Sequence, residues 1–476
     1  MDILIKAAQL IVALVILVTV HEFGHYIFAR IFGVKVNRFY LFFNPYFSIL
    51  RYNPKEGRLD FFARNGEPGK LSVKVGKPVA DRPDGKATWR DTVYGLGWVP
   101  LGGYCDIAGM VDETKDASQL ESTPQPWELR SKPAWQRLCV MVPGVVLNFV
   151  LAIIIYIGIA FHWGDDVVPL QAMTEGMDFS QEFRDSGFRD GDILLTLDGK
   201  PLDSKDYSLA WDMIQPGARV GVLRQGDTTE VVVSKELIGK IAAKGKDFVP
   251  MSPRVPVYVA KVVSGEPAAH AGLQPGDRIL TVGSDTVPSI TEFLPALKAH
   301  SGDTVAMRLI RADGRPDVVS IGISDAGKIG IQMLSPVEIF DRQTIRYSFF
   351  ESIPRGWEIG VDRLVSYVSS LKLVFTKEGA QSLGGFGTLG DLFPTSWNWY
   401  QFWQITAFLS IILAFMNIIP IPGLDGGYTL FLIVEMLTGR KPGDKFLEVV
   451  NTCGFVFLLL LLVYANGNDI YRFFIK

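Results

Sequence analysis

The distribution of apolar residues predicts four membrane-spanning helices. A helix needs about 20 predominantly apolar residues to cross the hydrocarbon core of a bilayer, and stretches near this length lie at about 3–25, 140–163, 402–419 and 453–465. The last stretch is short, so its helix is expected to begin earlier. The first has Lys6 as its basic residue near the amino end and no small-residue cleavage site before its histidines. We therefore interpret it as a retained span and not as a signal peptide.

The polar segment between the second and third spans contains an internal repeat. Residues 186–202 match residues 271–287, and the two copies share both glycines of an opening turn and the aspartate after the second glycine. Each copy runs from this turn into a strand (193–197, 279–282), and a helix is expected at 205–214 and 290–300. The repeat predicts two small β-rich domains that look like PDZ domains, in which a groove beside an open strand edge accepts a peptide or a chain end. A repeated β-domain without a ligand is the alternative.

The segment after the repeat predicts an amphipathic helix. Within 350–371, apolar residues recur at spacings of three and four with charged residues between them, so the helix is expected to lie in the outer interface or on the β-domains. The GxGxxG sequence at 385–390 follows no predicted strand and precedes no acidic residue placed for a ribose. A flexible hinge at the membrane edge is expected there, not a nucleotide site.

The connection between the first two spans contains aromatic, glycine-rich stretches and one polar, charged stretch. Residues 39–47 and 98–110 are aromatic and rich in glycine, and they predict strand-like segments that dip toward the bilayer against other protein. One of them, at 98–104, contains Gly102 and Gly103 and is expected to receive an unwound peptide by edge pairing. Residues 53–90 are polar and charged, which predicts a solvated insertion.

Composition and charge narrow the class of protein. The 476 residues are 48% hydrophobic and 12% aromatic, as expected for a membrane protein with soluble insertions. A net charge of −3 without a basic cluster excludes nucleic acid as a partner. The three cysteines have no CxxC spacing, so neither a disulfide framework nor a thiolate metal site is indicated.

The basic residues near the spans predict the orientation, because Lys and Arg resist translocation. They cluster after the first span, before the second and between the third and fourth: Arg30, Lys35, Arg38, Arg130, Lys132, Arg137, Arg440, Lys441 and Lys445. The flanks of the central segment, 163–182 and 386–401, contain none. The central segment and both termini are therefore expected outside the cytoplasm, although the terminal basic residues weigh against this.

Ionisable residues close the first span. In the sequence HEFGH, His21 and His25 are four residues apart and face the same side of a helix, so both imidazoles can bind one metal ion. Glu22 can reach a metal-bound water, which completes the HExxH arrangement of a zinc hydrolase. An ionisable side chain at membrane depth costs roughly 2.5–3.5 kcal/mol, so a functional role is indicated.

A second cluster, NIIPIPGLDGG at 417–427, closes the third span and contains one carboxylate, Asp425. Catalytic zinc needs a third protein ligand to leave one open position. Because one span lies between them, the first and third spans run parallel, and both clusters fall in the same leaflet. A solvated aspartate in a glycine turn is the alternative.

These motifs together resemble the site-2 protease family of intramembrane zinc metalloproteases, in its branch of regulator-of-sigma-E proteases with tandem PDZ domains. HEFGH, VPLGGY at 99–104, PGxxxNF at 143–149 and NxxPxPxLDGG occur in order along nearly the whole chain. The resemblance implies one zinc ion held by His21, His25 and Asp425, with Glu22 as base. It also implies that Asn148, Asn417 and Pro422 lie near the active centre.

The resemblance further implies a polytopic α-helical membrane protein of the bacterial inner membrane that carries two inserted β-rich domains. Its substrates would be single-pass membrane proteins already cut outside, such as anti-sigma factors, and remnant signal peptides. The alternatives are a catalytically idle scaffold that works through its PDZ pair and, less favoured, a zinc transporter. The expected divisions are 1–30, 31–138, 139–164, 165–253, 254–335, 336–400, 401–427 and 428–476.

Overall fold

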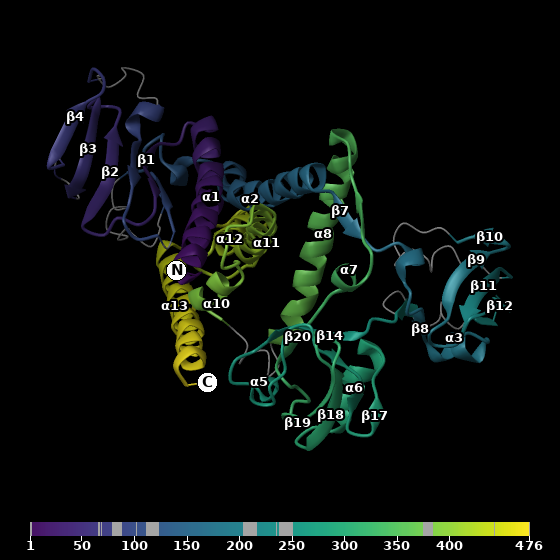
Figure 1. Cartoon of the computed structure of the whole chain (residues 1–476). Coiled ribbons are helices and arrows are strands. Elements are labelled where there is room, and N and C mark those ends of the chain that lie inside the picture. Colours follow the sequence, from purple (N-terminus) through teal and green to yellow (C-terminus); the bar gives the residue numbers. More distant parts are fainter. Residues whose placement is uncertain are drawn as a thin grey trace. The chain divides into compact units, whose positions relative to one another are not determined.

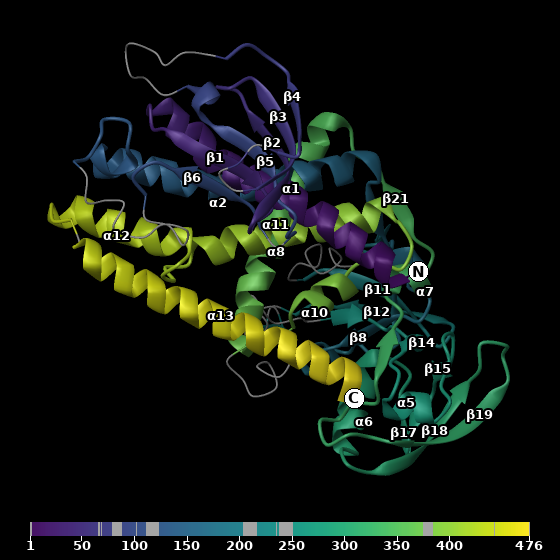
Figure 2. The same cartoon turned by 90° about the vertical axis from the view of Figure 1, so that its left-hand side faces the viewer.

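The computed structural model (Figures 1 and 2) describes residues 2–64, 67, 69–78, 88–100, 102–110, 123–202, 217–234, 236–237, 251–374, 384–441 and 443–475. The chain forms two compact units. One consists of Met1–Trp163 with Tyr347–Lys476, and the other is Gly164–Arg346. The second unit is therefore an insertion in the sequence of the first.

Four helices of the first unit are long and apolar enough to cross a membrane. They are α1 (Asp2–Ile31), α2 (Ala134–His162), α11 (Trp399–Ile418) and α13 (Asp444–Ile475). All four lie at the predicted stretches, and α13 begins before and ends after its apolar run because polar residues continue the helix on both sides. Helix α2 contacts both α1 and α11, so these three helices form the core around the two chemical clusters.

Helices α8, α10 and α12 differ from what the sequence predicted. Helix α8 (Phe349–Val374) was expected in the interface or on the β-domains, whereas its packing partners are α2 and α11. Its buried Ser352, Gly356 and Gly360 are spaced by four residues, and a Cβ on Gly356 would lie 2.5 Å from Ile157. Small residues at this spacing let two helices approach closely in a membrane protein, which explains the contact.

The expected hinge at 385–390 is wrong, because α10 (Phe386–Asp391) is helical there. Because its glycines have no side chains, Asn466 and Asp469 of α13 can approach and accept hydrogen bonds from the first backbone N–H groups of α10.

Helix α12 (Asp425–Thr438) was not predicted, since 428–476 was expected to hold a loop and one helix.

The connection between α1 and α2 contains a six-stranded sheet. Its strands are β1 (Val36–Leu41), β2 (Phe47–Asn53), β3 (Arg58–Arg64), β4 (Leu71–Lys74), β5 (Val93–Leu96) and β6 (Tyr104–Ile107), in the order β4-β3-β2-β5-β1-β6. Only the β1–β5 pairing is parallel among those described. Strands β1 and β6 contact α1, which attaches the sheet to the first span.

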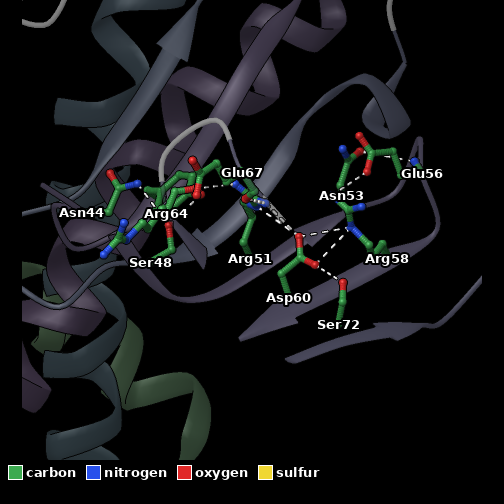
Figure 3. A network of polar contacts seen from close by, with 11 residues as sticks. Asn44, Ser48, Arg51, Asn53, Glu56, Arg58, Asp60, Arg64, Glu67 and Ser72 are labelled. Carbon is green, nitrogen blue, oxygen red and sulfur yellow. Dashed lines mark hydrogen bonds and ion pairs between the residues drawn. The ribbon is translucent and has the colours of Figure 1, made fainter. Parts of the chain in front are cut away.

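The expectation of a solvated insertion at 53–90 agrees with β4, whose four residues are exposed, but is wrong for β3, which has buried residues; both strands extend this sheet. Polar residues there alternate with apolar ones, as they do in a strand with two different faces. Asp60 is fully buried, pairs across the sheet with Arg51, and also contacts Arg58 and Ser72 (Figure 3). Burial alone would raise the pKa of Asp60, but hydrogen bonds from Ser72 and Arg51 and the nearby positive charges outweigh it and hold this pKa below its ordinary value.

Replacing Asp60 by asparagine is expected to destabilise the β3–β4 hairpin by about 1–3 kcal/mol, because Arg51 and Arg58 lose their buried partner. Since the pKa of Asp60 is lowered on folding, its stabilisation is complete above the unfolded pKa and is lost as the pH falls below about 4. Hydrogen exchange of β3 and β4 measures both effects. Glu56→Gln, which removes an exposed partner of Arg58, is the control and should change little; equal effects of the two substitutions would contradict the role of Asp60.

The second unit contains two β-domains with separate hydrophobic cores. The first has β8 (Met177–Phe179), α3 (Gln181–Asp185), β9 (Ile193–Leu197), β10 (Lys200–Pro201), β11 (Arg219–Arg224), β12 (Asp227–Val232) and β13 (Met251–Pro253). Four of these strands form a sheet in the order β10-β9-β11-β12. The helix expected at 205–214 lies outside the described residues.

The second domain contains a five-stranded sheet in the order β19-β18-β15-β14-β20. Its elements are β14 (Val257–Val262), α5 (Pro267–His270), β15 (Arg278–Ile279), β16 (Thr281–Val282), β17 (Asp285–Thr286), α6 (Ile290–Ala299), β18 (Thr304–Ile310), β19 (Pro316–Gly322) and β20 (Ile331–Met333). After α7 (Pro336–Ile339), β21 (Gln343–Ile345) pairs with β7 (Asp165–Val167). This pairing makes the unit end beyond the predicted boundary at 335.

The sequence repeat corresponds to a repeated contact. In the first domain the buried Asp192 binds Arg224 at 2.7 Å, and in the second the buried Asp277 binds Arg311 at 2.7 Å. Each arginine also donates to the carbonyl of the glycine in the opening turn, Gly187 or Gly272. An equivalent Asp–Arg ion pair thus stabilises the opening turn in both copies.

Candidate metal centre

Helices α1 and α12 bring together His21, His25 and Asp425. His21 Nε2 lies 3.0 Å from Asp425 Oδ2, His25 Nε2 lies 3.3 Å from the same oxygen, and the two nitrogens are 3.3 Å apart. The histidines come from α1, and Asp425 is the first residue of α12, which begins directly after the turn that ends α11. These three residues are the one group of possible metal ligands found in the part of the chain that the structure describes.

The donor atoms fit a zinc ion. Zinc bonds of roughly 2.0–2.2 Å to nitrogen and oxygen in a tetrahedral site separate neighbouring donors by about 3.3 Å, close to the separations found here. The site also lies in a buried setting, since His21 and His25 are each less than a tenth exposed. Apart from these two histidine nitrogens, Asp425 Oδ2 has no hydrogen-bond partner in the described part of the protein. A cation at this point would satisfy the oxygen and both nitrogens.

Two glycines let α1 and α2 approach closely enough to form the site. A Cβ on Gly24 would lie 2.7 Å from backbone atoms of Pro143 and Gly144. A Cβ on Gly144 would lie 2.5 Å from His25 Nε2 and 2.9 Å from His21 Cε1. Gly144 therefore leaves the space that the two imidazole rings occupy. The sequence motifs contained both glycines, but their role depends on packing between helices and could not be inferred from them.

Neighbouring groups orient the histidines with Nε2 toward Asp425. His25 Nδ1 donates to the carbonyl of Val140 at 2.9 Å. His21 Nδ1 faces the amide of the fully buried Asn148 at 3.2 Å, with the amide nitrogen nearest and Asn148 Oδ1 without a partner. The nitrogen and oxygen of an amide are exchanged by a half turn. In that orientation His21 Nδ1 donates to Asn148 Oδ1, and Nε2 is free to bind metal.

The other predicted site residues lie at different distances from the centre. Asn417 Nδ2 is 3.4 Å from His21 Nε2, so Asn417 borders the site. Pro422 lies in the turn before Asp425. Gly102 and Gly103 do not approach the ligands: a Cβ on Gly102 would meet the ring of Phe43, and one on Gly103 would meet Val18 and the carbonyl of Tyr40. These two glycines pack the sheet closely against itself and against α1.

Glu22 lies between the metal ligands and the sheet. Its carboxylate accepts a hydrogen bond from the backbone N–H of Cys105 on β6 and interacts electrostatically with His21, His25 and Asp425. Because β6 is terminal in the order of the six-stranded sheet, this contact places an edge strand beside Glu22. The site therefore combines a metal-ligand set, a carboxylate and an edge strand.

Comparison with known proteins agrees with this arrangement. Residues 9–59 and 71–461 match peptidase family M50. Of the omitted residues, 60–64 belong to β3.

Three relatives match over almost their whole length. A protein of Neisseria meningitidis named as a zinc metalloprotease is 26% identical over 97% of this chain and 98% of its own. The regulator of sigma E protease of Haemophilus influenzae is 25% identical over 99% of this chain and 100% of its own. Protease RseP of Yersinia pestis is 26% identical over 99% of this chain and 100% of its own. The chain therefore belongs to peptidase family M50, the site-2 protease family of zinc metalloproteases.

Proposed function

We propose that this membrane protease is an intramembrane endopeptidase with its active centre at His21, Glu22, His25 and Asp425. The observation that carries the proposal is the convergence of His21, His25 and Asp425 at the ends of apolar helices. When bound by these residues, zinc supplies a Lewis acid with one open position and a water made acidic enough to act as a nucleophile near neutral pH.

The chain's own residues have separate roles in this mechanism. Glu22 accepts the proton of the attacking water and returns it to the leaving nitrogen of the peptide. Asn148 and the Val140 carbonyl hold the two histidines in the orientation that directs Nε2 into the site. The amide of Asn417 borders the same site and is placed to donate to a substrate carbonyl oxygen, where negative charge develops.

The substrate must reach this site as an extended chain, because a helix hides its carbonyls in internal hydrogen bonds. The segment 98–104, which contains Gly102 and Gly103 and leads into the edge strand β6, is the proposed docking segment for this extended chain. Relatives named regulator of sigma E protease support anti-sigma-factor-like single-pass proteins as substrates, with remnant signal peptides as a second group.

The test of the proposed function is to compare membrane-fraction proteomes of cells with the wild-type protein and with Glu22→Gln. A transmembrane fragment that accumulates only with the variant identifies the substrate. The ends of this fragment show where the substrate was first cut outside the membrane. If no such fragment accumulates, and the purified wild-type protein cuts no model transmembrane segment, the idle-scaffold alternative is favoured.

The match to peptidase family M50 and to bacterial relatives supports a protein of the bacterial inner membrane. The distribution of Lys and Arg supports an orientation with Gly164–Arg346 and both termini outside the cytoplasm. In a background without native cysteines, Thr228→Cys is expected to react with an impermeant maleimide in intact cells, because 228 is exposed on the second unit. Glu56→Cys, in the exposed turn between β2 and β3, is expected to react only after lysis. The reverse pattern would invert the topology.

We also propose that the two PDZ-like domains act as a gate for trimmed substrates, and that their grooves can bind a peptide or chain end. Because β7 pairs with β21, residues 169–341 can be replaced by a short flexible linker while this pair is retained. The shortened protein is expected to cut a short substrate as before and to cut an untrimmed one as well. The same deletion with Glu22→Gln is the control, and a zinc-bound deletion protein that cuts neither substrate would contradict the gate.

A further inference from the structure

The fourth span touches the turn that leads to Asp425 at a glycine. Gly454 is buried on α13, whereas the neighbouring Phe455 and Phe457 are about half exposed. A Cβ on Gly454 would overlap the carbonyl group of Pro422 and lie 2.7 Å from Pro422 Cβ. On the other side of the contact, a Cβ on Gly423 would lie 3.3 Å from the backbone nitrogen of Phe455. The helix and the turn therefore meet backbone against backbone.

The turn is compact enough to transmit a displacement of Pro422 to Asp425. The Leu424 N–H donates to the Ile421 carbonyl at 3.1 Å, and the Gly427 N–H donates to the Leu424 carbonyl at 3.0 Å. A Cβ on Gly426 would overlap the carbonyl of Ile419, and one on Gly427 would lie 2.5 Å from the carbonyl of Ile421. Asp425 lies inside this closely packed segment, three residues after Pro422, so it cannot keep its place if the turn shifts.

The other end of α13 is held in a fixed register. Asp469 accepts hydrogen bonds from the backbone N–H groups of Gly385 and Thr388 at 2.9 and 3.0 Å, and Asn466 accepts one from Phe386 at 3.2 Å. The segment that they hold is joined to α1 by the ion pair between Lys6 and Asp391. Asp469 is about 22 Å along α13 from Gly454, at a rise of about 1.5 Å per residue. Helix α13 therefore cannot slide past an added side chain at 454 without breaking these contacts.

We propose that Gly454 is a positioning residue for the metal centre: it lets the fourth span support the turn at Pro422 and Gly423 so that Asp425 Oδ2 points at His21 and His25. The inference rests on the proposed metal site. A side chain at position 454 removes no ligand. It is expected to move the turn and to weaken and distort metal binding, as loss of a residue that supports a ligand commonly does.

The test uses the full-length protein in nanodiscs with Gly454→Ala, Gly454→Leu and, as control, Gly467→Leu. Gly467 lies on the same helix, is exposed, and has no heavy atom within 4 Å of an added Cβ. Zinc affinity is measured by competition with a chelator, and ligand geometry by the visible absorption of the cobalt-substituted protein. We expect Gly454→Leu to lower zinc affinity by about 10- to 100-fold and to shift the cobalt spectrum, Gly454→Ala to do so less, and Gly467→Leu to match the wild type.

The outcomes separate this inference from the proposed function. If the wild-type protein binds no zinc, the metal site itself is wrong. If the wild type binds zinc and folded Gly454→Leu keeps the same affinity and cobalt spectrum, the positioning role is wrong and the metal site stands. If Gly454→Leu does not fold, Gly454→Ala decides by the same two measurements.

Discussion

Glu22→Gln is expected to lower peptide cleavage by about 10²–10⁴-fold and to leave zinc bound. The size of the loss is that of removing one positioned acid–base group, because glutamine has nearly the same shape but cannot accept a proton from water. Zinc is retained because Glu22 is not among the three residues whose donor atoms converge. The backbone N–H of Cys105 on β6 can still donate to the amide oxygen of glutamine, so the edge strand keeps its contact.

The measurement is cleavage of a model transmembrane substrate by purified protein, together with zinc content by elemental analysis. Asp60→Asn is a suitable control, since Asp60 is a buried acidic residue of the same sheet that pairs with Arg51 and Arg58 on the strands away from α1. It is expected to keep most of the activity. Cleavage by Glu22→Gln at a rate near that of the wild type would remove Glu22 from the mechanism.

The sequence predicted the four spans and the three side chains that the structure brings together, because both are under strong physical constraints. A segment that crosses a bilayer must be long, apolar and helical, and this pattern survives in α1, α2, α11 and α13. A zinc site accepts few residue types at few spacings, so HEFGH and the lone carboxylate of the second cluster were sufficient to select His21, His25 and Asp425. The structure then brings these three donors within 4.8 Å of one another.

Features that depend on packing between distant segments could not be predicted in this way. The polar residues of β3 suggested that this strand is solvated. Asp60 is buried instead, because Arg51 from another strand compensates its charge. Helix α12 was missed because its 14 residues are too few for a span. The glycines at 385–390 suggested a hinge, although their use is to admit Asp469. In each case the local pattern was compatible with two structures, and a partner far along the chain selected one.

Asp425→Ala is expected to lower both zinc affinity and cleavage, in contrast to Glu22→Gln. Asp425 Oδ2 lies 3.0 and 3.3 Å from the two histidine nitrogens, and alanine places no donor there. Loss of residues that only support a ligand weakens metal binding by about 10- to 100-fold, so loss of a ligand should exceed that range. The acidic side chain also favours the N-terminus of α12, but by only about 0.3–1 kcal/mol, so α12 should still form.

The matched control for this experiment is Glu435→Ala, which removes another carboxylate from α12. Glu435 pairs with Arg137 on α2 and takes no part in the metal centre. Its loss should leave zinc affinity unchanged while the stability of the α2–α12 contact falls. If Asp425→Ala instead keeps full zinc occupancy and loses only cleavage, the carboxylate is not a ligand. It then acts by orienting His21 and His25, and two imidazoles with water would have to hold the metal.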